Sequence, residues 1–233
     1  MFHQKFIGVI SLFLFLNVSF TSLVQAQSQA GTWYVYFFKH QFKESNFGIQ
    51  GDTQYHDWKI VSDFSQFIVR SGVTFTPKNT RIKFVLGYAY VLNGKLGESK
   101  ETINENRIYQ EILLPQKVGS RFYFTHRFRY EERFVENQDF RTRFRYNLFL
   151  NVPLNKKEFE YKAIYLTFYN ELFINGEKSI GNDREVEYFD RNRTYLGLGY
   201  FLKPNAKLQL GWIRQVTNLT HNGQVQLSLF HTF

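Results

Sequence analysis

The chain of 233 residues is 19% aromatic, with 27 Phe and 15 Tyr, yet 21% of its residues are charged and its mean hydropathy is negative. A water-soluble domain this polar would not normally carry so much Phe, so we expect the apolar side chains to face something other than a compact core. The formal net charge is +9 and there is no Cys, which excludes a disulfide framework and any Cys-ligated metal site.

The first 26 residues have the anatomy of a secretory signal peptide. Lys5 precedes an apolar run over residues 6–16, and a small-residue cleavage site ends at Ala26. The alternative is a membrane anchor, but the run is well below the ~20 residues that a spanning helix needs. We therefore predict a signal peptide at residues 1–26 and a single mature domain at residues 27–233.

Strand-like segments then follow one another almost to the end of the chain, with turn-forming residues between them. No later window has a long apolar run or a sustained helical period. Eleven segments are visible, at residues 33–42, 47–56, 64–76, 81–91, 107–114, 120–134, 140–151, 161–174, 189–201, 206–215 and 224–233.

The segments at residues 120–134 and 140–151 show the alternation most clearly. Phe128 and Phe144 share one parity with other aromatic residues, whereas Arg129 and Arg145 share the other parity with further arginines. Because successive side chains of a strand point to opposite faces, this hairpin has an aromatic face and an arginine face. Alternation alone does not say which of them meets solvent.

Three features favour an outward apolar face over a soluble sandwich or lipocalin-like barrel with the apolar residues inside. Segments of ~10 to 15 residues exceed the ~5 to 6 usual in soluble sheets. The apolar parity is rich in Phe, Tyr and Leu over many segments, as in a lipid-facing band. The chain ends at Phe233, similar to the C-terminal targeting signal of outer-membrane proteins, although His231 stands where that signal usually has an aromatic residue.

The predicted fold is therefore all-β, a transmembrane antiparallel up-and-down β-barrel. The connections at residues 77–79, 115–119 and 202–205 are short, those at 92–106 and 175–188 are long, and the two kinds fall at opposite ends of the barrel. Short periplasmic and long extracellular connections are typical of outer-membrane barrels. Because such barrels usually have an even strand number, we expect twelve strands, with the missed one upstream of Phe64, or else ten.

Several further motifs accompany Trp33, at residues 87–90 (GYAY), 126–134 (HRFRYEERF), 170–173 (NELF) and 189–200 (FDRNRTYLGLGY). In these residues the chain resembles the bacterial family DUF2490, common in Bacteroidetes, and the resemblance covers nearly all of the mature chain. It implies an outer-membrane-type β-barrel in a bacterial outer membrane. It implies no activity.

The arginine parity is the candidate functional site. If it faces the lumen, the barrel has either a mainly structural, ion-paired interior or a narrow anion-favouring pore, since rings of Arg select anions. The expected lining or anion-binding residues are Arg127, Arg129, Glu131, Arg133, Arg141, Arg143, Arg145, Glu171, Arg191 and Arg193.

Other functions have less support. An outer-membrane lipid-modifying enzyme would need a catalytic constellation, and no Ser stands at a recognisable spacing near His126, His221 or His231. A soluble secreted barrel that binds a small ligand stays open as an alternative. We expect no cofactor, metal or nucleic acid. The expected partners are outer-membrane lipid and the barrel-assembly machinery, and the oligomeric state stays open.

Overall fold

The computed structural model describes residues 30–233, so the predicted signal peptide at residues 1–26 lies outside the described residues. Eleven strands follow one another in this part of the chain: β1 Gly31–Gln41, β2 Phe47–Lys59, β3 Ser62–Phe75, β4 Lys83–Gly94, β5 Thr102–Val118, β6 Phe122–Val135, β7 Arg141–Pro153, β8 Ile164–Asn175, β9 Phe189–Lys203, β10 Ala206–Val216 and β11 His221–Thr232. Each of the eleven predicted segments corresponds to one of them.

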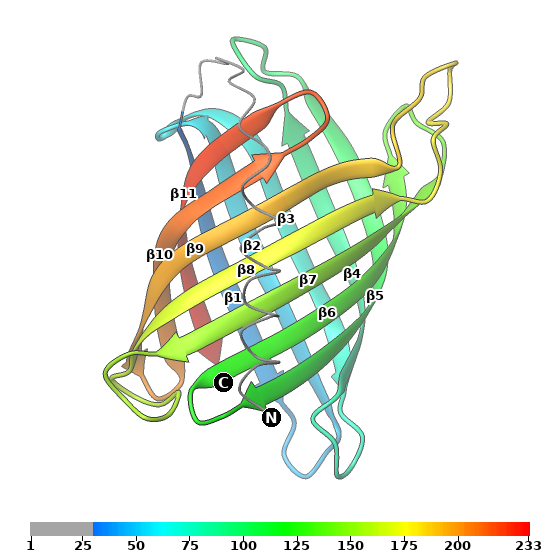
Figure 1. Ribbon diagram of the computed structural model, residues 1–233. Coiled ribbons are helices and arrows are strands. Elements are labelled where there is room, and N and C mark those ends of the chain that lie inside the picture. Colours follow the sequence, from blue (N-terminus) through cyan, green and yellow to red (C-terminus); the bar gives the residue numbers. More distant parts are fainter. Residues whose placement is uncertain (1–29) are drawn as a thin grey trace, which may run out of the picture.

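The strands form one closed barrel in which each strand pairs with its neighbours in the chain (Figure 1). All consecutive pairs are antiparallel, whereas β1 and β11 close the barrel in parallel, from Gly31 opposite Gln224 to Lys39 opposite Thr232. Every hairpin reverses the chain direction, so an odd number of strands makes the first and last run the same way. The predicted all-β barrel is confirmed.

The expectation of twelve strands, with ten as the second choice, is wrong for the described residues. β1 is hydrogen-bonded to β2 on one side and to β11 on the other, which leaves no place for a further strand. β2 and β3 are separated only by Ile60 and Val61. Eleven strands close into a barrel because β1 and β11 pair in parallel, so no twelfth strand is needed for closure. The odd strand number departs from the even numbers usual in single-chain bacterial barrels.

The predicted asymmetry of the connections is largely lost. β5 begins at Thr102 rather than at residue 107, so the connection before it shrinks to residues 95–101. At the end of the barrel that holds the C-terminus, the connection between β7 and β8 takes up residues 154–163, while residues 176–188 join β8 to β9 at the opposite end. Connection length therefore does not orient the barrel.

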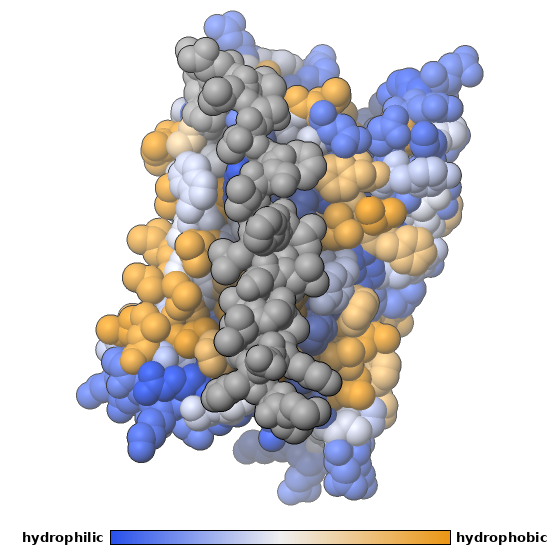
Figure 2. All heavy atoms as spheres, viewed as in Figure 1, coloured by the Kyte–Doolittle hydropathy of each residue, from blue (hydrophilic) through white to orange (hydrophobic). Residues whose placement is uncertain are grey.

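The two faces of the wall have opposite chemistry. Phe128 and Phe144 are 46% and 53% exposed on the outer face, whereas Arg129 and Arg145 are buried inside. A soluble barrel with an apolar interior would have the reverse arrangement. On the face seen in Figure 2, apolar side chains gather along the middle of the wall, with hydrophilic residues at both ends. None of the described residues forms a helix long and apolar enough to cross a membrane, which has no bearing on crossing by strands.

Glycines allow inward tyrosine rings to lie flat on the wall. A Cβ at Gly199 of β9 would overlap the ring of Tyr165 of β8, which is fully buried. We expect Gly199→Ala to lower the free energy of unfolding by about 1–3 kcal/mol, because the ring must leave its packed position. Equilibrium unfolding measures the change. In a Tyr165→Leu background the same substitution should cost much less, and equal losses in both backgrounds would contradict this packing.

Candidate functional site: the arginine-lined interior

Strand register places like charges side by side on the inner wall. Arg129 of β6 lies opposite Arg145 of β7, and Arg133 lies opposite Arg141. Like charges directly opposite each other destabilise a sheet, so the arrangement needs interleaved carboxylates. Glu131 supplies the first of them, between the two arginine pairs and opposite Arg143.

Glu131 is 1% exposed and accepts hydrogen bonds from arginines on two strands. Arg143 donates from Nε at 2.9 Å and from Nη2 at 2.6 Å to Oε2, and Arg145 donates from Nη1 at 2.6 Å to Oε1. Arg129 of its own strand is 3.5 Å from the same Oε1. Such charge-assisted pairs are the strong kind, and here they connect β6 to β7.

Two further carboxylates extend the network across the wall. Glu171 of β8 accepts from Arg145 at 2.9 and 2.6 Å and from Arg127 at 2.6 Å. Glu111 of β5 accepts from Arg129, whose Nε is 2.6 Å from Oε2 and whose guanidinium lies over the ring of Tyr109. The network therefore runs without a break from β5 to β8.

At the end of the barrel opposite the C-terminus, Glu105 of β5 accepts two bonds of 2.8 Å from Arg107 and one of 2.5 Å from Arg133. Asp190 pairs with Arg143 at 2.7 Å and with Arg191 at 3.1 Å. The β8–β9 register shifts beside Asp190, which is left without a partner on β8. This bulge turns inward a side chain that simple alternation would place outside.

A buried ring lies where the guanidinium groups of β7 and β9 meet. Phe173 of β8 is 1% exposed, and Arg143, Arg145, Arg191 and Arg193 all lie 4.3–5.9 Å from its ring centroid. Guanidinium groups are weakly hydrated and stack on aromatic faces. Phe173 therefore separates these four guanidinium groups by packing against them. Unlike a carboxylate, its ring does not neutralise their charge.

Arg141, Arg193 and Lys207 line the interior without a carboxylate partner among the described residues. Arg141 is 7% exposed, makes no side-chain hydrogen bond within residues 30–233, and has a buried, unsatisfied Nε. Arg193 donates from Nε to Gln215 at 2.7 Å and lies 4.9 Å from the rings of both Trp33 and Phe173. Lys207 is held by aromatic contacts, 4.8 Å from Phe159.

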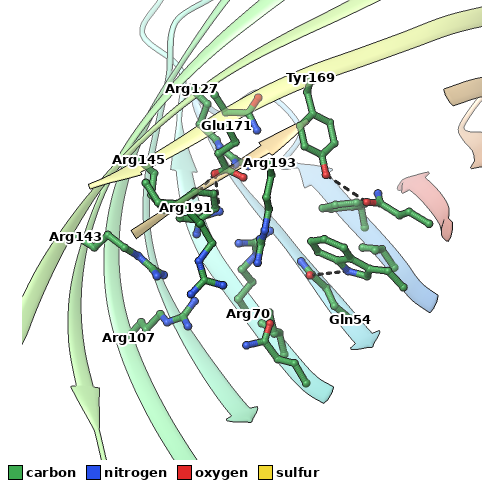
Figure 3. A pocket seen from close by; sticks show the side chains of 18 of the residues that line it. Gln54, Arg70, Arg107, Arg127, Arg143, Arg145, Tyr169, Glu171, Arg191 and Arg193 are labelled. Carbon is green, nitrogen blue, oxygen red and sulfur yellow. Dashed lines mark hydrogen bonds and ion pairs between the residues drawn. The ribbon is translucent and has the colours of Figure 1, made fainter. Parts of the chain in front are cut away.

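The interior contains a cavity of about 410 Å³, lined along β7 from Arg141 to Asn151. Figure 3 shows arginines of β3, β5, β6, β7 and β9 among the side chains that line it. A second cavity of about 210 Å³, towards the end that holds the C-terminus, shares Arg127, Phe149 and Lys207 with the first. The charged residues around the larger cavity are two carboxylates, Glu105 and Glu171, and ten cations, Arg70, Arg107, Arg127, Arg133, Arg141, Arg143, Arg145, Arg191, Arg193 and Lys207.

All ten predicted site residues lie on the inner face of the barrel wall, at Arg127, Arg129, Glu131, Arg133, Arg141, Arg143, Arg145, Glu171, Arg191 and Arg193. The sequence reasoning missed several of their partners. Glu105, Arg107 and Glu111 share one parity of β5. Arg107 and Glu111 lie within the predicted segment at residues 107–114 and could have been found by its alternation, whereas Glu105 requires a longer strand. Asp190 could not have been found from the sequence, because its inward position depends on the bulge in β9.

The residues considered for enzyme chemistry do not converge. His126 bonds the hydroxyl of Tyr146 at 2.8 Å on the outer face, and His231 bonds Tyr36 at 3.2 Å near the last residue. Within residues 30–233 no three His, Asp or Glu side chains form a group that could hold a metal ion. Phe233, the predicted targeting residue, is exposed and packs its ring on that of His231, 4.1 Å away.

The fold and the interior together define a class: a closed β-barrel with an apolar outer band and an arginine–carboxylate network inside. Comparison with protein families then gives the particular family. The chain belongs to the family described as protein of unknown function (DUF2490), whose model matches residues 30–226. This confirms the resemblance seen in the sequence. Neither the curated proteins nor the solved structures include a match.

Proposed function

We propose that the mature chain is an outer-membrane β-barrel, inserted after removal of residues 1–26. The apolar outer band supports this proposal, because soluble monomers rarely expose contiguous apolar patches of more than a few hundred Å². Strands of 11 to 17 residues are long enough to cross a bilayer when tilted. On this proposal the outer face contacts lipid, the barrel-assembly machinery inserts the chain, and Phe233 belongs to its targeting signal.

We further propose that the interior is a narrow anion-favouring path held open by a structural network. Eight of the ten inward arginines pair with carboxylates and stabilise the wall. The observation that carries the proposal is the unequal lining of the larger cavity, with nine arginines and one lysine against two carboxylates. A pore wall with excess fixed cations attracts anions and repels cations.

Planar-bilayer recording of the refolded protein across a salt gradient tests this path. We expect small conductance steps whose reversal potential indicates anion preference. Arg141→Glu and Arg193→Glu should each shift the preference towards cations, because these two arginines have no internal counter-charge. Arg81→Glu makes the same change on an exposed connection between β3 and β4 and should leave selectivity unchanged. A cation preference of the unaltered protein, or no conductance at any salt concentration, would contradict the path.

A further inference from the structure

The larger cavity changes character along its length. Arg141, at the start of β7, and Phe149, near its end, both line the cavity and are eight residues apart, roughly 27 Å along the strand. Around Arg141 the lining is cationic and amide-bearing, with Arg107 and Gln138. Around Phe149 it is mostly aromatic, with Phe37 and Phe230, although Arg127 and Lys207 lie against these rings.

Arg193 lies where these two regions meet. Its Nε is occupied by Gln215, while its two terminal nitrogens have no hydrogen-bond partner among residues 30–233. The flanking rings of Trp33 and Phe173, each 4.9 Å away, restrict the guanidinium plane. Figure 3 shows Arg193 extending into the cavity from the wall that carries Glu171. A free, oriented guanidinium fork matches a carboxylate through two parallel hydrogen bonds.

The aromatic part of the cavity is built for contact with a flat apolar group. The rings of Phe37 and Phe230 are stacked, with centroids 4.6 Å apart, and Phe149 and Tyr169 lie 5.4 Å apart. The hydroxyl of Tyr169 and the indole of Trp33 are already bonded, since Tyr169 donates to Gln226 at 3.3 Å and Trp33 donates to Gln54 at 3.1 Å. Two cations lie against the rings, with Arg127 5.3 Å from the ring of Phe149 and Lys207 5.2 Å from that of Phe230. This part of the cavity therefore offers ring surface beside two cations, Arg127 and Lys207.

We propose that this cavity binds a planar organic carboxylate, with the carboxylate on Arg193 and the ring against the neighbouring aromatic side chains. This inference rests on the proposed anion-favouring interior. A volume of about 410 Å³ lies in the range of small-molecule sites. An inorganic anion would make no use of the rings. A neutral aromatic molecule would leave the Arg193 fork unpaired.

Isothermal titration of the full-length mature chain in detergent with benzoate tests the site. Acetate supplies the carboxylate without the ring, and benzamide supplies the ring without the charge. We expect benzoate to bind more tightly than either. Arg193→Gln should weaken benzoate binding by about tenfold or more, the loss expected for hydrogen bonds to a charged group. Arg81→Gln, the same change on an exposed connection, should have no effect.

Arg193→Lys is the second variant, because it keeps the charge but lacks the planar fork. Intermediate affinity in a folded Arg193→Lys protein, checked by circular dichroism, supports bidentate binding even where Arg193→Gln fails to fold. Equal binding of acetate and benzoate, or of benzamide and benzoate, would overturn the proposal, as would unchanged affinity of Arg193→Gln. Anion-selective conductance without benzoate binding would overturn this inference alone, whereas benzoate binding without conductance would overturn only the path.

Discussion

Glu131→Gln is expected to lower the free energy of unfolding by about 3–5 kcal/mol, the loss typical when one partner of a buried ion pair is removed. The neutral amide keeps the shape of the side chain but leaves Arg143 and Arg145 without their shared counter-charge. Glu171 still forms an ion pair with Arg145, and Asp190 still forms one with Arg143. We therefore expect a barrel that folds but is less stable. Equilibrium unfolding in denaturant, with the protein in lipid vesicles, measures the change.

Glu132→Gln is the matched control, one residue further along β6. Its side chain has the opposite parity and makes no ion pair or side-chain hydrogen bond within the described part of the chain. We expect no loss of stability, because neutralising this outward carboxylate breaks no ion pair and removes a charge from the face proposed to meet lipid. Equal losses for the two variants would mean that the charge network does not hold β6 and β7 together.

The barrel could be predicted from the sequence because period-two alternation is a local signal that survives in almost every strand. Phe128 against Arg129, repeated over many segments, marks two faces of opposite chemistry, and the turn residues between segments set the hairpins. The strand count could not be predicted as easily. Whether β1 meets β11 in parallel is decided by closure of the whole sheet, which leaves no mark on either strand.

The inward arginines could be predicted from the sequence, whereas the inward carboxylates could be predicted only in part. Arginines opposite aromatic residues stand out in alternation, whereas Glu105 lies among Asn104 and Asn106, which together suggest a loop. In the structure these asparagines accept hydrogen bonds from Tyr90 and Tyr88 on the outer face, which explains how so polar a stretch extends β5. The charge excess inside is therefore smaller than the sequence alone suggests, and around the larger cavity it is concentrated at Arg141, Arg193 and Lys207.

Leu196→Arg is expected to destabilise the barrel in lipid by about 2–4 kcal/mol, the cost of an arginine on the lipid face near the bilayer midplane. Leu196 lies at the middle of β9, is 54% exposed, and is flanked by Phe168 and Trp212 on the neighbouring strands. In a water-soluble barrel the same substitution would add a charge to an exposed surface and change stability by no more than about 0.5 kcal/mol. Equilibrium unfolding in vesicles distinguishes the two cases.

Leu219→Arg provides the control, since Leu219 is 93% exposed on the connection between β10 and β11. At this end of the barrel an arginine meets water or lipid headgroups, so we expect no loss of stability in vesicles. The contrast between the two variants depends on the position of the residue relative to the apolar band, because the substitution itself is identical. Equal stability of both variants in lipid would show that the outer band does not face hydrocarbon, and the proposed membrane location would fall with it.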